Sequence, residues 1–444
     1  MTKKGIPARA CSRWVRKRAP SPRLAATLCA AMILWTALPV QAGGFSNVDF
    51  GTRRVGMLAV IAHPDDPTAI FHNPAGLLLT PGTAAYFSAS TFLFDAGIRL
   101  YDSQGHLHPD HTISPETAMG VSPFLAVTSD LATERWRVGI AAYAPNVFGT
   151  SLPEDEPTRY MALDVLFIAA RATASAAVEI DPRLVLGANL NCLMIHMKAS
   201  RMMNPLVFDD PDKRFDEGVW PTDSRMELSG FGYTFTGDIG VLLRPLPTLD
   251  IGAMFASGAP VHLDGSVTLE EPTGDVTTIG HTTSLAIPFT LQGGINWRLS
   301  DDFEVAADIR YWHYQVLQEQ RTVLDAPLMG KTEFVDPKNY GNSLNVALGV
   351  LCHVTPSWEF MVGVLRDWSP IPTPMVTLDN PNRDRIGVGT GLRWNVSDAW
   401  RIGAAFERNW YDLTDNQESP TDPPSNAKGY GANMILAFDL LWRL

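Results

Sequence analysis

The chain has 444 residues, of which 35 are lysine or arginine and 47 are aspartate or glutamate, giving a formal net charge of −12 at pH 7. An acidic protein lacks the basic face with which proteins bind phosphate backbones, so we do not expect nucleic acid as a partner. The chain is too long for one ordinary soluble core, yet no clear linker divides it into domains.

The first 42 residues have the composition of a secretory signal peptide. Eight lysines and arginines, with no acidic residue among them, precede an apolar run from Leu24 to Leu38, and Val40-Gln41-Ala42 fits the small-residue pattern of a cleavage site. The run is about fifteen residues long, whereas a membrane-spanning helix needs about twenty. We predict that residues 1–42 are cleaved off, with a retained anchor as the alternative. Removing the eight basic residues would leave 27 against 47 acidic ones, a net charge of −20.

The next segment, residues 43–81, contains the stretch HPDDPTAIFHNPAGL from His63 to Leu77. It holds an acidic pair, Asp65-Asp66, then a short apolar step and Asn73-Pro74-Ala75. Proline fixes its own φ near about −65° and disfavours helical backbone at the residue before it, which predicts a tight turn here. Asn-Pro alone is a common turn dipeptide, so the rest of the chain decides how this segment is interpreted.

From near Gly82 to near Trp442, apolar and polar residues alternate with a period of two, which is typical of strands with two different faces. In the last such stretch, Tyr430 begins an apolar series of alternate residues, while Asn433 and Asp439 belong to the other face. No stretch after residue 42 is apolar over the length that a transmembrane helix needs.

Six short turns alternate with seven long polar connections along this region. The short turns lie at 128–134, 181–183, 245–247, 300–302, 355–357 and 397–399, and the long connections at 101–118, 146–158, 201–225, 269–282, 322–340, 370–382 and 412–428. Together they delimit fourteen strands. Short turns at one end and long loops at the other are typical of an outer-membrane barrel.

The predicted fold is therefore all-β: a 14-stranded antiparallel transmembrane β-barrel spanning residues 82–444. A closed ring pairs every backbone polar group, which hydrocarbon cannot do. Tryptophans near the strand ends agree with an aromatic girdle at the membrane surface. A large soluble β-sandwich, β-helix or propeller is the alternative, but the chain has no fixed repeat period and its strands are longer than usual.

These features resemble the FadL-type outer-membrane transporters, which carry long-chain fatty acids and, in a toluene/xylene branch, aromatic hydrocarbons. The resemblance rests on the start Gly43-Gly44-Phe45, on Asp65-Asp66 with Asn73-Pro74-Ala75, and on two motifs near the C-terminus, Arg366-Asp367-Trp368-Ser369-Pro370 and Pro381-Asn382-Arg383-Asp384-Arg385. The chain departs from the family in having Asn382 where aspartate is frequent, and in ending with Leu444 rather than an aromatic residue.

The resemblance implies that residues 43–81 form an N-terminal plug inside the barrel lumen. Ligand-binding residues would then include Gly43, Gly44 and Phe45, and plug or gating residues would include Asp65, Asp66, Asn73, Pro74 and Ala75. It also implies an inward kink of the third strand, for which Gly139 is the candidate because glycine weakens strand pairing. The inward polar side chains expected to bind the plug are Glu304, Asp308, Arg310, Arg385, Arg393, Arg401, Glu407 and Asp439.

The sequence thus predicts a non-enzymatic channel of the bacterial outer membrane, one that takes up long-chain fatty acids by plug rearrangement and lateral release. Uptake of aromatic or alkane hydrocarbons, a lipid-active outer-membrane enzyme and a general porin are the alternatives. The expected partners are the hydrophobic ligand, membrane lipid and lipopolysaccharide, around a monomer.

No cofactor or metal is expected. His106, His108 and His111 could bind a metal, but exposed loop histidines usually do not. Cys192 and Cys352 could form a disulfide in an oxidising compartment, although two isolated thiols are the preferred interpretation.

Overall fold

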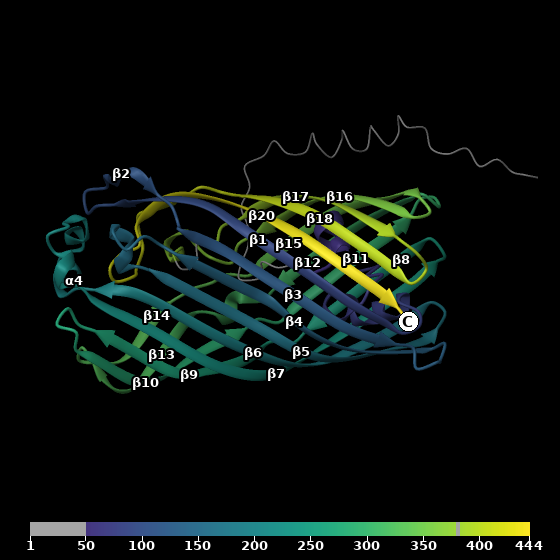
Figure 1. The fold of residues 1–444 in the computed structure, drawn as a ribbon, viewed down its shortest axis with the longest axis horizontal. Coiled ribbons are helices and arrows are strands. Elements are labelled where there is room, and N and C mark those ends of the chain that lie inside the picture. Colours follow the sequence, from purple (N-terminus) through teal and green to yellow (C-terminus); the bar gives the residue numbers. More distant parts are fainter. Residues whose placement is uncertain (1–49, 379–381) are drawn as a thin grey trace, which may run out of the picture. The chain divides into compact units, whose positions relative to one another are not determined.

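The computed structural model of the protein describes residues 50–378 and 382–444. These residues form an antiparallel β-barrel that closes where the first strand, β1 (Ala84–Tyr101), pairs with the last, β20 (Ala427–Arg443) (Figure 1). The strands between them are β3 (Thr117–Ser129), β4 (Trp136–Ser151), β5 (Asp164–Asp181), β6 (Leu184–Met203), β7 (Ser224–Leu246), β8 (Leu249–Ala256) with β9 (Ala259–Glu270), β10 (Val276–Ile287) with β11 (Thr290–Arg298), β12 (Phe303–Trp312) with β13 (Glu319–Leu328), β14 (Lys331–Pro337) with β15 (Ser343–Thr355), β16 (Trp358–Trp368), β17 (Arg385–Asn395) and β18 (Trp400–Tyr411).

Each pair joined by "with" is one interrupted strand of the ring, so the predicted fourteen strands are confirmed. All six short turns lie where the sequence predicts them. The long connections carry smaller elements: β2 (Leu107–Ile113), η2 (Pro157–Tyr160), α4 (Pro205–Asp209), η3 (Pro211–Phe215), η4 (Trp220–Thr222), η5 (Tyr314–Val316), η6 (Thr373–Met375) and β19 (Thr414–Asn416).

Two of the seven predicted long connections, 269–282 and 322–340, are wrong. There the strands continue as hairpins, with a turn at residues 271–275 between β9 and β10 and a two-residue turn at Met329-Gly330 between β13 and β14. The many polar residues of these segments suggested loops, but cross-strand pairs hold the segments extended. One such pair is Arg321 with Glu333, whose charged groups lie 2.7 Å apart.

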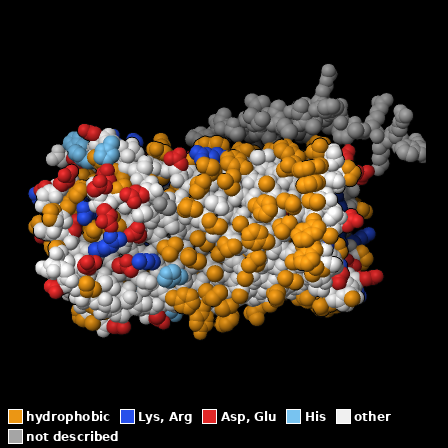
Figure 2. Space-filling model, in the orientation of Figure 1, with side chains coloured by type: hydrophobic (Ala, Val, Ile, Leu, Met, Phe, Trp, Pro, Cys, Tyr) orange, Lys and Arg blue, Asp and Glu red, His pale blue; other side chains and the backbone are white. Residues whose placement is uncertain are grey.

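The two faces of the wall differ as the alternation predicts. Along β3, Leu125 and Val127 are exposed to 53% and 47%, whereas Phe124 and Ala126 are buried. Hydrophobic side chains cover the middle of the barrel surface and charged ones gather toward its two ends (Figure 2). At the short-turn end, Trp400 stacks on its cross-strand neighbour Trp442 with ring centroids 5.3 Å apart. This surface suits a hydrocarbon layer bounded by aromatic side chains.

The chain before β1 packs inside the ring. It forms α2 (Thr52–Met57), α3 (Ala69–His72) and η1 (Pro74–Leu79), and we call residues 50–81 the plug. α2 contacts β15 to β18 and β20, while η1 contacts β4 to β7, so the plug touches opposite sides of the wall. Wall glycines permit this approach: a Cβ on Gly349 or Gly363 would lie 2.0 or 2.2 Å from the Met57 carbonyl oxygen.

Residues 43–49 of the predicted plug, and the predicted signal peptide, lie outside the described residues. Cys192 and Cys352 are both free thiols. Among the described residues, no helix has the length and apolarity to cross a membrane.

Candidate functional site

The acidic pair of the plug binds arginines of the wall. Asp65 accepts two hydrogen bonds of 2.8 Å from the guanidinium of Arg393, which also donates to Glu359 at 2.6 Å. Asp66 lies 3.4 Å from a guanidinium nitrogen of Arg401. Arg393 on β17 and Arg401 on β18 are inward residues of neighbouring strands. The two carboxylates therefore fix the plug to one side of the barrel through paired buried charges, which are costly to separate.

Other wall carboxylates hold the plug directly. Asp439 accepts hydrogen bonds from the Thr52 backbone at 2.8 Å and from its hydroxyl at 2.6 Å. Asp308 accepts from the backbone N–H of Val60 at 2.6 Å, and Glu304 accepts from the guanidinium of Arg53 at 2.8 Å.

Five of the eight inward residues predicted to bind the plug thus do so: Glu304, Asp308, Arg393, Arg401 and Asp439. The other three contact wall residues: Arg310 lies 3.7 Å from Asp308, Arg385 donates to Asp367, and Glu407 accepts from Asn409. All eight residues are buried, so strand alternation predicted their inward face correctly.

The Asn73-Pro74-Ala75 turn fits a flat part of the wall. The Asn73 side chain accepts from the Ala75 N–H at 3.2 Å and donates to the carbonyls of Ile61 at 3.0 Å and Val241 at 3.1 Å. A Cβ on Gly240 of β7 would lie 2.1 Å from the Asn73 side-chain oxygen. Asn73 therefore caps η1, connects two segments of the plug through Ile61, and joins the plug to β7 through Val241.

A cavity of about 320 Å³ lies in the lumen beside the plug. Its lining is largely apolar and includes Phe71 of the plug and the phenylalanines 94, 148 and 167 of the wall. Three cationic side chains also line it: Arg171, Arg310 and Lys338. An apolar cavity with a few placed polar groups is the usual form of a site for a small amphipathic ligand.

The wall is irregular next to this cavity. Pairing of β3 with β4 stops at Phe124–Tyr143 and resumes at Met119–Gly149. A Cβ on the lumen-facing Gly120 would lie 2.3 Å from the Val147 carbonyl, so the third strand bends inward here. Residues 145–148 of this bend line the cavity.

A model of the family described as outer membrane protein transport protein (OMPP1/FadL/TodX) matches residues 33–433. The chain belongs to this family. Its FadL-type barrel is accordingly an outer-membrane barrel, and the family members and structural neighbours are transport channels rather than enzymes.

Two curated FadL-type relatives are named long-chain fatty acid transport protein. The Escherichia coli O6:H1 protein is 23% identical over 111 residues, 24% of each chain, and the Salmonella typhi protein is 23% identical over 196 residues, 43% of each chain. The matched segments therefore span less than half of these relatives.

Solved FadL-type structures share the fold over most of the chain. A Pseudomonas aeruginosa FadL homologue gives a TM-score of 0.78 at 16% identity, covering 90% of this chain and all of that one. The P. putida toluene transporter TodX gives 0.69 at 13% identity, covering 90% and 99%. At such identity the likeness concerns the fold.

The remaining predicted site residues fall into two groups. Gly43, Gly44 and Phe45 lie outside the described residues. Gly139 is in the described part but is regularly paired with Thr128 and Ser175, and the bend lies at Ala144-Pro145 instead. A Cβ on Gly139 would lie 2.9 Å from the Ile70 side chain, so this glycine makes room for the plug.

Sequence reasoning missed the residues that shape the cavity, above all Arg171 and Phe71. Arg171 lies among alternating small residues of β5, where one inward arginine in an apolar stretch was a usable signal. Phe71 gave no such sequence signal, because an aromatic residue in a short helix of the plug is common.

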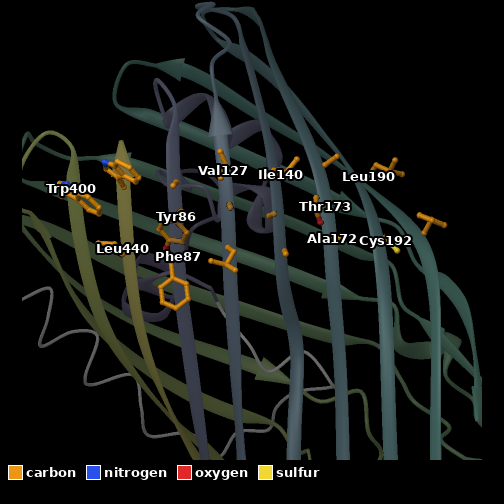
Figure 3. Close-up of a pocket in the computed structure, with 18 residues that line it drawn as sticks. Tyr86, Phe87, Val127, Ile140, Ala172, Thr173, Leu190, Cys192, Trp400 and Leu440 are labelled. Carbon is orange, nitrogen blue, oxygen red and sulfur yellow. The ribbon is translucent and has the colours of Figure 1, made fainter. Parts of the chain in front are cut away.

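A second, larger hollow of about 800 Å³ lies on the outside of the wall (Figure 3). Outward side chains such as Phe87, Ile140 and Leu190 line it, and its floor includes Ala142 and Ala172. Its apolar surface fits the membrane-facing side of the barrel. The inner cavity, which touches the plug, is therefore the better candidate for the ligand site.

The loop histidines do not converge. His106 and His108 both contact Asp102, at 3.2 and 3.1 Å, while His111 contacts Glu156 at 2.6 Å. Within the described residues, no group of three histidine, cysteine or acidic side chains could hold a metal ion. Desolvation raises the pKa of Asp102, but hydrogen bonds led by that from the His106 N–H outweigh it and lower the pKa to about 2.

Proposed function

We propose that this protein takes up long-chain fatty acids through the outer membrane, acting as a monomer in contact with membrane lipid and lipopolysaccharide. The observation that supports this proposal most directly is the lumen cavity, whose lining is largely apolar and includes cationic side chains. A fatty acid has the matching chemistry: an alkyl chain, whose burial gains about 0.8 kcal/mol of free energy per CH₂, and one carboxylate.

Arg171 is the proposed carboxylate ligand. Arg310 and Lys338 lie beside Asp308 and Asp336, at 3.7 and 2.5 Å, so their charges are already compensated. The Nε of Arg171 is buried and lacks a hydrogen-bond partner among the described residues. A carboxylate would supply that partner, whereas toluene would not.

The route proposed for the ligand runs from the external loops to the cavity and then sideways into the membrane. Several observations support lateral release: the plug occupies the lumen, the third strand bends inward, and the bend borders the cavity. Sideways exit keeps an alkyl chain out of water, which favours this route over exit into the periplasm. Movement of the plug, held by its acidic pair and by Asn73, would open the way.

The alternative ligand is an aromatic hydrocarbon, which the phenylalanines of the cavity favour. Arg171→Met keeps the length of the side chain and removes its charge. We expect it to weaken palmitate binding to the purified protein about ten- to one-hundred-fold, the effect of losing a charge-assisted hydrogen bond. Toluene binding should be unchanged.

Arg321→Met, which removes an exposed arginine outside the cavity, is the matched control. Uptake of both compounds is then measured in cells that lack their own fatty acid transporter. If the protein binds and takes up toluene but neither binds nor takes up palmitate, the proposal is overturned in favour of a hydrocarbon channel.

A further inference from the structure

A buried series of polar side chains joins the lumen cavity to the plug. It begins at Arg171 on β5, which lines the cavity and hydrogen-bonds the Tyr143 hydroxyl of β4. The Thr173 hydroxyl lies 3.1 Å from that of Tyr143 and 2.7 Å from the side-chain oxygen of Asn191 on β6. The hydrogen bonds of these residues thus connect the neighbouring strands β4, β5 and β6.

The series ends on the plug backbone. The side-chain amides of Asn191 and Asn189 each donate to the same oxygen of Asp238 on β7, at 2.9 Å. The Asn189 amide also donates to the Ile70 carbonyl of α3, at 2.6 Å. Phe71, the next residue, lines the cavity. One amide group is therefore shared between a buried wall carboxylate and the plug.

Asp238 is a buried charge with limited compensation. It is 3% exposed, and the hydrogen bonds to its Oδ2 come from the two neutral asparagine amides. Tyr143, Thr173 and Asn191 connect it to Arg171 through the hydrogen bonds described above. A carboxylate bound at Arg171 would offset the positive charge there, so Asp238 would depend more strongly on the two asparagine amides.

We propose that Asp238 and Asn189 couple the ligand carboxylate at Arg171 to release of the plug at Ile70. This inference rests on the proposed function, because only a ligand with a carboxylate can act on Arg171 in this way. Binding of the carboxylate draws the Asn189 amide toward Asp238 and away from the Ile70 carbonyl. Asp238 and Asn189 are positioning residues, since neither lines the cavity.

A coupling residue and a merely structural one differ in how the plug responds to the ligand. Asn189→Leu removes the hydrogen bonds of this amide to both the Ile70 carbonyl and Asp238, so it should abolish the coupling. We expect this variant to bind palmitate while amide hydrogen exchange at Ile70 no longer responds to it. Loss of a merely structural contact would leave that response in place.

The decisive measurement is hydrogen–deuterium exchange at the amides of residues 70–73 in the purified full-length protein, with palmitate and with hexadecanol. In the unaltered protein, palmitate should speed exchange at least about threefold and hexadecanol should not. In Asp238→Asn, palmitate should still bind and the speeding should disappear. Thr322→Val changes a buried wall residue that contacts Thr283 rather than the plug, and should keep the palmitate response.

The outcomes separate the two proposals. Failure of the unaltered protein to bind palmitate would overturn both the proposed function and the coupling. Palmitate binding without faster exchange, an equal response to hexadecanol, or a full response in Asp238→Asn would overturn the coupling alone. If Asp238→Asn does not assemble, Asn189→Leu decides, because faster exchange with palmitate in that variant contradicts the coupling.

Discussion

Replacing Asn73 by alanine should loosen the plug and weaken its contact with the wall without opening the barrel. The substitution removes the cap of η1, worth about 1 kcal/mol. It also removes hydrogen bonds to the Ile61 and Val241 carbonyls, worth about 1 kcal/mol each. Only the Val241 bond joins the plug to the wall, so docking of the plug should weaken by about 1 kcal/mol, or about fivefold, while loss of the cap and of the Ile61 bond loosens the plug itself.

The assay combines uptake of labelled palmitate with the heat-dependent gel mobility that reports a folded barrel. We expect reduced uptake and normal mobility, because the strand pairing of the wall does not involve Asn73. Asn204→Ala is a matched control, since Asn204 also precedes a proline, caps α4 by accepting from the Leu206 N–H at 3.0 Å, and lies in an external connection.

Three results would refute this reasoning. Normal uptake by Asn73→Ala would show that the motif is an ordinary turn with no part in gating. Loss of heat-dependent mobility would show that the residue is needed to fold the barrel. Equal loss of uptake in Asn204→Ala would mean that the effect is not specific to the plug.

Three further outcomes are expected. Gly187→Val should raise single-channel conductance by displacing the plug, because a Cβ at Gly187 would lie 2.3 Å from the Ala75 nitrogen. In the control Gly237→Val the nearest atom to the added Cβ is 3.5 Å away, and equal conductance of the two variants would contradict the prediction. The pKa of Asp102 is lowered in the folded loop, so the contribution of this carboxylate to loop stability is present above the ordinary value of 3.8 and is lost as the pH falls toward about 2. Limited proteolysis of the first external loop should therefore accelerate over that pH range in the unaltered protein but not in Asp102→Asn. N-terminal sequencing of the membrane form should begin at Gly43, and a retained N-terminal segment would disprove cleavage after Ala42.

Local patterns were sufficient for the wall. Alternation with a period of two assigns each side chain a face, and turn residues separate the strands, so fourteen strands follow without long-range information. The same rules failed at residues 269–282 and 322–340, where polar and turn residues are frequent, yet the strands continue as hairpins whose inner face buries Leu269, Leu324 and Leu328. Charged residues there mark the exposed face of a hairpin rather than the absence of a strand.

The sequence by itself thus determined the barrel, the inward direction of Asp308 and Asp439, and the turn at Asn73. Only the tertiary structure decided that Asp439 meets Thr52, 387 positions away, or that Arg171 borders a cavity beside Phe71. The physical reason is that a barrel sets the height and rotation of each inward side chain through the stagger of all its strands together. A plug contact depends on that shared geometry, and no single segment encodes it.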